Sequence, residues 1–387
     1  MHSAMTSENR QNAAARTHAL CRSVLMVGTH LDGIGGIRAV VQGYIDAGLF
    51  RRYPCVYVPT HRYGSARIKA ITALQAWIRV AILLHRLDAP LVHVQMASRA
   101  SFWRKSIVCL MARLARRPYL LHVHGGEFLH FYEKESGRAA QRFIRNIFAN
   151  AALVIALSEE WRERLLRICP VANVEVLSNA VALPDLAERA NLSERDPVED
   201  TTLLFLGDIS RGKGTFDLIR SFARVAPRFP RLKLVCGGLG SIDDAHRLAV
   251  GLDVGERVVC PGWLDPERKR AVFSNATIFV LPSYAEGMPM ALLEAMSWGL
   301  PVITTAVGGI PQLITHEING LLLSPGDIDG MAAGIARLMS DPELRQKLGS
   351  AARATVAGSY SLEKAVERLE RIYRRFGVEA QVFGDSS

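Results

Sequence analysis

Short apolar runs alternate with longer amphipathic stretches along most of this chain of 387 residues. Each run has the length of a buried strand, and the stretches between them have the apolar spacing of helices that cover a sheet. Such alternation favours a parallel sheet with helical crossovers. The first series of runs lies at 23–28, 55–58, 91–95, 119–123 and 153–157.

A second series follows in the other half of the chain, at 203–207, 232–238, 257–260, 277–281 and 301–305. Residues 184–201 separate the two series; they are polar, include two prolines and are predicted to be an interdomain linker. We therefore expect two facing, Rossmann-like, doubly wound α/β domains, one at 21–183 and one at 202–357, with a cleft between them.

The two ends of the chain are predicted to be tails. Residues 1–20 are polar and alanine-rich without the apolar core of a signal peptide, and 378–387 form a second tail. Between the second domain and that tail, 358–377 have apolar residues at helical spacing, with Ser361 as a candidate N-cap. This helix has to bury its apolar side, and we expect it to cross back to the first domain.

The positive charge of the chain is concentrated in its first half. The net charge is +10, and residues 51–120 contain 13 basic residues and one acid, Asp88. Such a region attracts an anionic partner, with nucleic acid and acidic lipid as candidates. Two basic helical stretches, 66–87 and 102–117, fit either an anionic membrane surface or ordinary packing on the sheet. Six scattered cysteines fit a reducing cytosol.

Two glutamates flank a predicted helix start in the second half, in the segment EGMPMALLE. Pro289 suits the beginning of a helix, where its missing N–H is not needed. Free N–H groups near Met290 and Ala291 then form an anion site suited to a diphosphate. Because a carboxylate accepts hydrogen bonds from neighbouring hydroxyls, Glu286 is a candidate ligand for a sugar and Glu294 for a ribose.

A glycine-broken turn in the sequence GDISRGKG follows the strand that ends at Gly207. Arg211 and Lys213 on this turn are candidates to neutralise a diphosphate leaving group, since both precede a helix near the acid pair. Trp263, after the strand at 257–260, is a weaker candidate for contact with a nucleotide base; a packed or surface tryptophan is the competing interpretation.

These residues resemble the retaining glycosyltransferases of family 4, which have the two-domain GT-B fold. The pattern EG-x-P-x-x-L-x-E-A-M-x-x-G-x-P is complete here, and VGGIP at 307–311 and NGLL at 319–322 match as well. The resemblance implies that Gly287, Met288 and Pro289 line the donor site. Asp208 stands where the family usually has arginine, and Arg211 is a candidate to replace that cation.

The first half adds a glycine-rich loop and a pair of histidines. Glycines follow the first strand, and the resemblance implies that Gly35 and Gly36 face the donor phosphates and the acceptor. His122 and His124 lie on one face of a strand, but no third metal ligand is nearby. We expect His122 to be a buried core residue, whereas His124 matches the family histidine that contacts the donor sugar.

The reaction implied by the resemblance is transfer of a hexose from a UDP- or GDP-linked donor to a saccharide or polyprenyl-linked saccharide, with retention and without a metal. A bacterial cell-surface or exopolysaccharide pathway and a cytoplasmic location, peripheral on the inner membrane face, are the matching expectations, with no nucleic acid partner. A GT-B sugar-nucleotide epimerase and a non-catalytic nucleotide-sugar-binding protein remain alternatives. A Rossmann oxidoreductase is a further alternative, but this sequence has no complete G-x-G-x-x-G motif.

Overall fold

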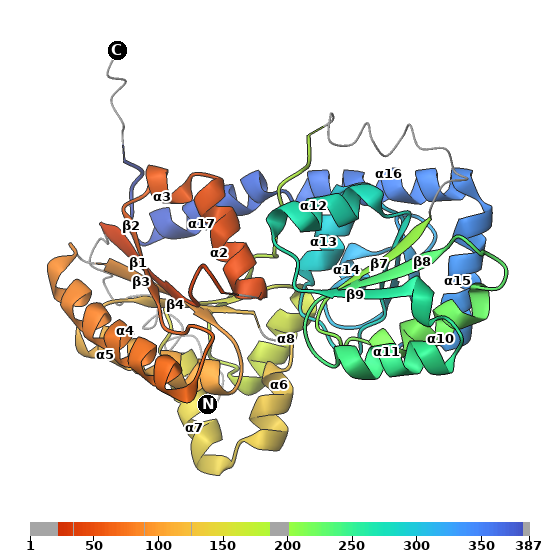
Figure 1. Cartoon of the computed structure of the whole chain (residues 1–387). Helices are drawn as coiled ribbons and strands as arrows, with labels where there is room; N and C mark the ends of the chain where they lie inside the picture. The colour runs from red at the N-terminus through yellow and green to blue at the C-terminus, as the bar shows by residue number, and fades with distance from the viewer. Residues whose placement is uncertain (1–21, 34, 89, 125, 186–200, 382–387) are drawn as a thin grey trace, which may run out of the picture.

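The protein consists of two lobes, each built around a six-stranded parallel sheet (Figure 1). A computed structural model describes residues 22–33, 35–88, 90–124, 126–185 and 201–381. The predicted tail at 1–20 and nearly all of the predicted linker at 184–201 lie outside these ranges. The two sheets of the GT-B architecture are therefore present as expected.

The first sheet has the strand order β2-β1-β3-β4-β5-β6, and every pair is parallel. Its central strands are buried throughout because helices cover both faces. One face packs under α4 and α5, and the other under α2, α3 and α17. The strands are β1 (Ser23–Gly28), β2 (Cys55–Pro59), β3 (Pro90–Met96), β4 (Tyr119–Val123), β5 (Leu153–Ala156) and β6 (Val174–Val176).

The second sheet has the order β12-β11-β10-β7-β8-β9 and is also parallel. In such sheets, ligands bind beyond the carboxyl ends of the strands. The loops after β7, β9 and β10 therefore matter most for function. The strands are β7 (Thr202–Leu206), β8 (Lys233–Gly237), β9 (Val258–Gly262), β10 (Ile278–Leu281), β11 (Val302–Thr305) and β12 (Leu321–Leu323).

The helices are mostly short crossovers between neighbouring strands. In the first lobe they are α2 (Gly36–Asp46), α3 (Leu49–Arg52), α4 (Ala66–Arg86), α5 (Ala100–Leu114), α6 (Phe128–His130), the π-helix η1 (Phe131–Glu135), α7 (Arg138–Ala149) and α8 (Glu159–Ile168). In the second lobe they are α10 (Thr215–Val225), α11 (Ile242–Gly251), the 3₁₀ turn η2 (Gly255–Arg257), α12 (Pro266–Asn275), α13 (Met290–Ser297), α14 (Ile310–Leu313), α15 (Ile328–Ser340) and α16 (Pro342–Ser359).

The last helix, α17 (Leu362–Arg375), returns to the first lobe as expected. The chain crosses beside Val181, whose backbone pairs with Tyr360 and Leu362 on either side of the bridge to Ser361. Ser361 occupies the N-cap position, but its side chain makes no capping hydrogen bond. Val378, which the sequence placed in a tail, is fully buried against the same core.

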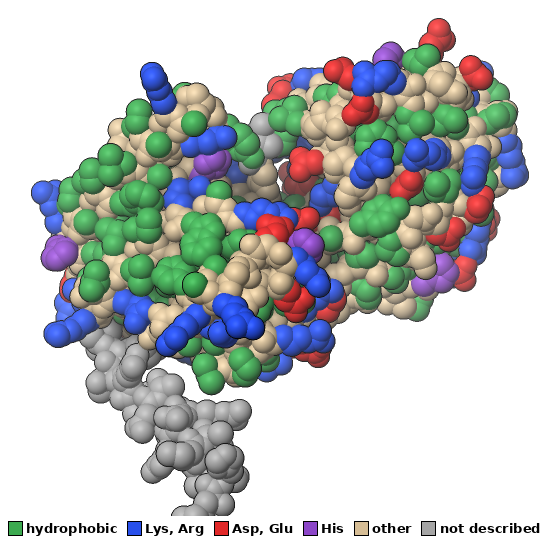
Figure 2. All heavy atoms as spheres, turned by 90° about the horizontal axis from the view of Figure 1, so that it is seen from below, with side chains coloured by type: hydrophobic (Ala, Val, Ile, Leu, Met, Phe, Trp, Pro, Cys, Tyr) green, Lys and Arg blue, Asp and Glu red, His purple; other side chains and the backbone are tan. Residues whose placement is uncertain are grey.

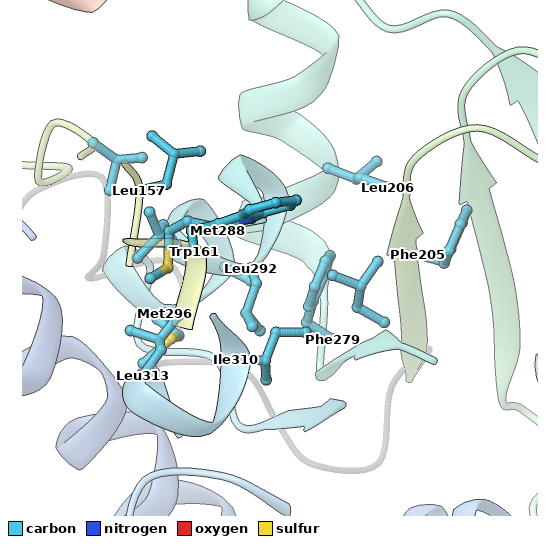
Figure 3. Close-up of a cluster of buried hydrophobic side chains, with 14 of the residues drawn as sticks. Leu157, Trp161, Phe205, Leu206, Phe279, Met288, Leu292, Met296, Ile310 and Leu313 are labelled. Carbon is cyan, nitrogen blue, oxygen red and sulfur yellow. The ribbon is translucent and has the colours of Figure 1, made fainter. Parts of the chain in front are cut away.

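The two lobes also share buried apolar contacts beside the interlobe loops. Figure 3 shows Leu157 and Trp161, which follow β5 in the first lobe, next to Met288 of the second. Trp161 and Met288 are each only 3% exposed. The Ser158 hydroxyl, 3.2 Å from the Trp161 N–H, caps α8 and so fixes the position of this tryptophan. This packing holds the two lobes against each other next to the loop that carries Glu286.

Candidate active site

The loop between β10 and α13 carries the first candidate carboxylate. Glu286 is 8% exposed, and its Oε1 accepts hydrogen bonds from Ser283 Oγ at 2.7 Å and Lys213 Nζ at 2.6 Å. Pro289 is the N-cap of α13, so the helix begins at Met290. The predicted helix start is therefore present, and its free N–H groups lie directly after the Glu286 loop.

Lys213 reaches Glu286 because the turn after β7 packs against the end of β10. Gly214 has φ +69°, and a Cβ there would lie 2.1 Å from the carbonyl oxygen of Pro282. Only glycine fits so close an approach at a positive φ. Gly207, at the end of β7, donates its N–H to the Gly237 carbonyl oxygen at 3.0 Å. Backbone packing thus places the cation of this turn beside the carboxylate.

Arg211 lies on the same turn but is not brought to Glu286. Its side chain is exposed and has no ion-pair partner among the residues that the structure describes. Asp208, at the position where the family usually has arginine, is exposed as well. The guanidinium is free to reach a ligand, and its replacement of the family arginine stays a prediction.

Glu294 forms a second ion pair, which the sequence analysis missed. Lys269 Nζ of α12 lies 2.6 Å from Oε1 and 2.5 Å from Oε2 of Glu294. Both side chains are partly buried. Lys269 is one of several cations in PERKR, and only the packing of α12 beside α13 distinguishes it from its neighbours. The two glutamates therefore have different lysine partners, each from a different element.

The two lobes meet backbone to backbone at the Glu286 loop. A Cβ on Gly126 would lie 3.1 Å from the Gly287 nitrogen, and a Cβ on Gly287 would lie 3.0 Å from Trp161 Nε1. Asn179, also missed from sequence, donates its Nδ2–H to the Met288 carbonyl oxygen at 2.7 Å. These contacts bring the loop after β4 to the loop after β10.

The VGGIP turn packs against the loop that carries Glu286. Gly309 donates its N–H to the Gly287 carbonyl oxygen at 2.9 Å. A Cβ on Gly308, where φ is +56°, would lie 1.8 Å from the Glu286 carbonyl oxygen. The VGGIP motif, which contributed to the family resemblance, therefore packs against the consecutive carbonyl groups of Glu286 and Gly287.

His124 is the first-lobe side chain predicted for the site, and it follows β4 at this meeting point. Its ring is half-buried, and Nε2 lies 2.6 Å from Gln95 Oε1. Burial, with the nearby Lys105 and His93, lowers the pKa of His124 to about 3. The imidazole is therefore neutral at physiological pH. His122 is fully buried, as expected for a core residue.

The glycine loop and Trp263 are exposed. A Cβ on Gly35 or Gly36 would meet no atom within 4 Å, so the N-terminus of α2 faces open space. Gly35 has φ +119°, which only glycine adopts readily. Trp263 is 44% exposed on the turn after β9. Figure 2 shows the surface hollowed between the two lobes, with acidic side chains near the hollow.

Two family models match the two halves of the chain. Residues 11–180 match the Glycosyl transferase 4-like domain, and residues 188–355 match Glycosyl transferases group 1. The chain belongs to the group 1 glycosyltransferases. A curated relative, alpha-D-kanosaminyltransferase of Streptomyces kanamyceticus, is 28% identical over 283 residues, which cover 70% of this chain and 73% of the relative.

Solved structures share the GT-B fold of this glycosyltransferase. Sucrose-phosphate synthase from Thermosynechococcus elongatus superposes with a TM-score of 0.73 at 20% identity, covering 92% of this chain and 99% of that one. Anabaena HepE in complex with UDP-glucose gives 0.72 at 17% identity, covering 91% and 100%. In the glycosyltransferase described here, no group of three or more His, Cys, Asp or Glu side chains suited to a metal occurs among the described residues.

Proposed function

We propose that this glycosyltransferase moves a hexose from a UDP- or GDP-linked donor to a hydroxyl of a saccharide or polyprenyl-linked saccharide, with retention and without a metal. The observation that carries the proposal is the pair of Lys213 and Glu286, 2.6 Å apart, beside the start of α13. A cation, a carboxylate and free N–H groups are thereby assembled at one edge of the sheet. These are the groups that a sugar diphosphate needs.

Each group has a proposed role in binding the donor. The N–H groups at the start of α13, around Met290 and Ala291, bind the diphosphate, and Lys213 and Arg211 neutralise it. Glu286 accepts hydrogen bonds from hydroxyls of the sugar, and Glu294 from those of the ribose. The different lysine partners of the two glutamates support this division.

Retention follows if the acceptor attacks the face of the sugar from which the diphosphate leaves. The bond from the acceptor oxygen to the anomeric carbon forms as the bond to the phosphate oxygen breaks. The acceptor proton passes to that phosphate oxygen, so no side chain has to act as the base. The protein then contributes positioning and charge stabilisation, which are large terms in catalysis.

A donor screen tests the proposal, beginning with UDP-glucose because HepE is described in complex with it. Hexose transfer to a saccharide acceptor should retain the anomeric configuration, measured by proton NMR of the product. Activity should persist with excess EDTA. Inversion of the anomeric configuration would overturn the retaining mechanism. Loss of transfer in the presence of EDTA would overturn metal independence. Incubation with donor alone separates transfer from epimerisation, because an epimerase converts the donor without an acceptor.

We propose further that the enzyme acts in the cytoplasm, on the inner membrane face, in bacterial exopolysaccharide or cell-surface polysaccharide synthesis. The support is the outer side of α4, whose apolar side chains are exposed in a row. Helix α4 is long and apolar enough to cross a membrane by length and composition, and 22% of its apolar window is buried. Ile71, Leu74, Ile78 and Ile82 are 45–56% exposed.

Basic residues accompany this apolar row. Arg67, Lys69, Arg79 and Arg86 lie on the same helix, which contains no acidic residue. Figure 2 shows hydrophobic side chains gathered on this side of the first lobe with Lys and Arg side chains among them. Apolar groups that enter the headgroup layer, together with cations, are the features by which helices bind anionic lipid in the membrane plane.

Liposome sedimentation tests the membrane surface. The enzyme should sediment with phosphatidylglycerol vesicles at low salt, and much less with phosphatidylcholine vesicles. The double change Leu74→Ser and Ile78→Ser should reduce sedimentation, whereas Val171→Ser and Val250→Ser, which alter exposed valines elsewhere, should not. No sedimentation with acidic vesicles, or equal loss in both variants, would overturn this part of the proposal.

A further inference from the structure

A row of polar side chains crosses the face of the first sheet that α2 and α17 cover. His93 and Gln95 are two residues apart on β3, and His122 and His124 are two residues apart in and just after β4. Residues two apart in a strand share a face. The side chains around them are apolar: Val24, Met26, Leu91, Leu120 and Leu153. Polar groups in such a core are costly unless they are hydrogen bonded.

Three hydrogen bonds join this row to the last helix. Tyr373 OH of α17 lies 2.8 Å from His93 Nδ1, and Gln95 Nε2 lies 3.2 Å from His93 Nε2. Gln95 Oε1 lies 2.6 Å from His124 Nε2. Tyr373, His93 and Gln95 are all fully buried. A continuous buried chain therefore leads from the last helix to the half-buried His124 at the interlobe edge.

The orientation of the Gln95 amide determines which group donates and which accepts at each step of the hydrogen-bond chain. The amide nitrogen donates to His93 Nε2, so the proton of His93 is on Nδ1 and is donated to the Tyr373 oxygen. The amide oxygen accepts from His124, so the proton of His124 is on Nε2. The Nδ1 atom of His124 then has a lone pair, and no described residue hydrogen-bonds to it. A sugar hydroxyl can donate to that lone pair, whereas an anionic phosphate oxygen cannot.

The charges around His124 are consistent with this neutral form. Burial, together with Lys105 on α5 and His93 on β3, lowers the pKa of His124 to about 3. The ring centroids of His122 and His124 are 4.2 Å apart. Gln95 adds no charge. A carboxylate at position 95 would instead favour an imidazolium on either side of it. The glutamine thus fixes the orientation of His124 without charging it.

We propose that Tyr373, His93 and Gln95 are positioning residues that hold His124 as its Nε2–H tautomer and leave its Nδ1 lone pair to accept a hydrogen bond from a hydroxyl of the donor sugar. The last helix is then part of the machinery for transfer as well as a link between lobes. This inference rests on the proposed function for the identity of the ligand; the hydrogen-bond chain belongs to the free protein.

The tautomer of His124 can be measured without substrate, by NMR of enzyme labelled with ¹⁵N-histidine and assigned with His124→Ala. The wild type should show Nε2–H at His124. Tyr373→Phe keeps the aromatic ring, which packs edge-on against Tyr53 and His93, but removes the acceptor for His93 Nδ1–H. His93 can then adopt its other tautomer, with the proton on Nε2. The Gln95 amide can rotate to accept that proton with its oxygen, and an Nδ1–H signal should appear at His124.

Tyr44→Phe is the matched control, because it removes another buried hydroxyl from the same core without touching the chain. It should leave the signal of His124 unchanged. An Nδ1–H tautomer in the wild type would overturn the proposal. An unchanged tautomer in Tyr373→Phe would overturn it as well.

Kinetics provide the second measurement. Gln95→Met should lower kcat by about a hundredfold and Tyr373→Phe by about tenfold, with the KM for the donor changed by less than about threefold. Gln95→Glu should raise the pKa of His124. At pH values below neutral, kcat should therefore decrease in this variant and in no other. A normal kcat in Gln95→Met would contradict the positioning role.

These outcomes test the hydrogen-bond chain and the proposed function separately. If His124→Ala transfers hexose at the wild-type rate, the assignment of His124 to the donor sugar is wrong even when the tautomer is as proposed. If His124→Ala is slow but Tyr373→Phe alters neither tautomer nor kcat, the positioning proposal alone is wrong.

Discussion

The ammonium nitrogen of Lys213 lies 2.6 Å from Oε1 of Glu286, although the two residues are 73 positions apart in the sequence. They meet because Gly214 allows the turn after β7 to touch the carbonyl of Pro282. The Ser283 hydroxyl fixes the same carboxylate oxygen. The structure thus presents a preorganised pair of charges, and preorganisation is what allows such groups to stabilise charge as a bond breaks.

Removal of the Lys213 ammonium should slow transfer strongly. We expect Lys213→Ala to lower kcat by about a hundredfold, since a cation that stabilises a leaving diphosphate contributes on this scale. Steady-state kinetics with the donor identified by the screen measure the effect. Arg247→Ala, which removes a surface cation paired with Asp244 on α11, is the control and should be near normal. A Lys213→Ala enzyme as fast as this control would remove the lysine from the mechanism.

Arg211 gives a separate prediction because its side chain is exposed. If it replaces the family arginine that Asp208 displaces, Arg211→Ala should also lower kcat by about a hundredfold. Lys213→Ala and Arg211→Ala combined should be slower than either alone. A near-normal rate for Arg211→Ala would leave Lys213 as the proposed cation of this turn.

The two glutamates should separate binding from turnover. Glu294→Gln should raise the KM for the donor by about tenfold with little change in kcat, because it weakens a charge-assisted contact to the ribose. Lys269→Met should raise the same KM by a smaller factor, since Lys269 holds both oxygens of Glu294. Glu286→Gln should mainly lower kcat. Equal effects of Glu286→Gln and Glu294→Gln on kcat and KM would show that their roles are misassigned.

The sequence predicted both sheets because fully buried parallel strands are continuous apolar runs. The run at 23–28 coincides with β1, and the run at 119–123 with β4. Two outer strands, β6 and β12, were missed, since each has only three residues and so shows no periodicity. The motif around Glu286 was recognisable because its glycines, proline and glutamates serve one compact loop and helix start.

The partners in the site were harder to predict than its motifs. Lys269, Asn179 and Gln95 come from elements whose local sequences have no special pattern, and each gains its role only through packing against a distant segment. Tyr373 is one of the residues at apolar helical spacing within 358–377. Its hydroxyl meets His93 only because α17 crosses to the first lobe. Such contacts depend on tertiary structure, which no local spacing encodes.

Lys105 should reduce stability at neutral pH. Its side chain is fully buried with Ser101 Oγ at 3.0 Å, and burial together with Arg104 lowers its pKa to about 7. The unfolded chain therefore binds one more proton between about pH 7 and 10.5, so stability rises with pH across that window. Lys105→Met should raise the free energy of unfolding by a few kcal/mol (about 1.4 per pKa unit) at pH 7.

The gain from Lys105→Met should shrink at pH 9.5, because the penalty for keeping the folded lysine neutral falls by about 1.4 kcal/mol per pH unit as pH rises from the folded pKa of about 7 toward the unfolded value. Urea unfolding of the first lobe at both pH values measures this difference. Lys347→Met, a change at an exposed lysine, should give no such pH-dependent gain. A gain for Lys105→Met that is equal at both pH values would mean that packing, and not charge, is responsible.

Acid should destabilise the first lobe through its buried histidines. Burial lowers the pKa of His93 and His124 to about 3 and that of His122 well below its ordinary value. Below about pH 6.5 the unfolded chain binds protons that the folded lobe excludes, so stability is lost as pH falls from 6.5 toward 3. Each histidine contributes up to about 1.4 kcal/mol per pH unit in that window.

Replacement of one imidazole should flatten this acid dependence. His122→Phe retains an aromatic ring against His93, with which His122 stacks at 5.5 Å, and removes one of the three excluded protons. Its loss of unfolding free energy between pH 6.5 and 5 should be smaller than that of the wild type by about 1 to 2 kcal/mol. His246→Phe, at an exposed position on α11, should follow the wild type. Parallel curves for the wild type and His122→Phe would show that His122 is not among the groups responsible.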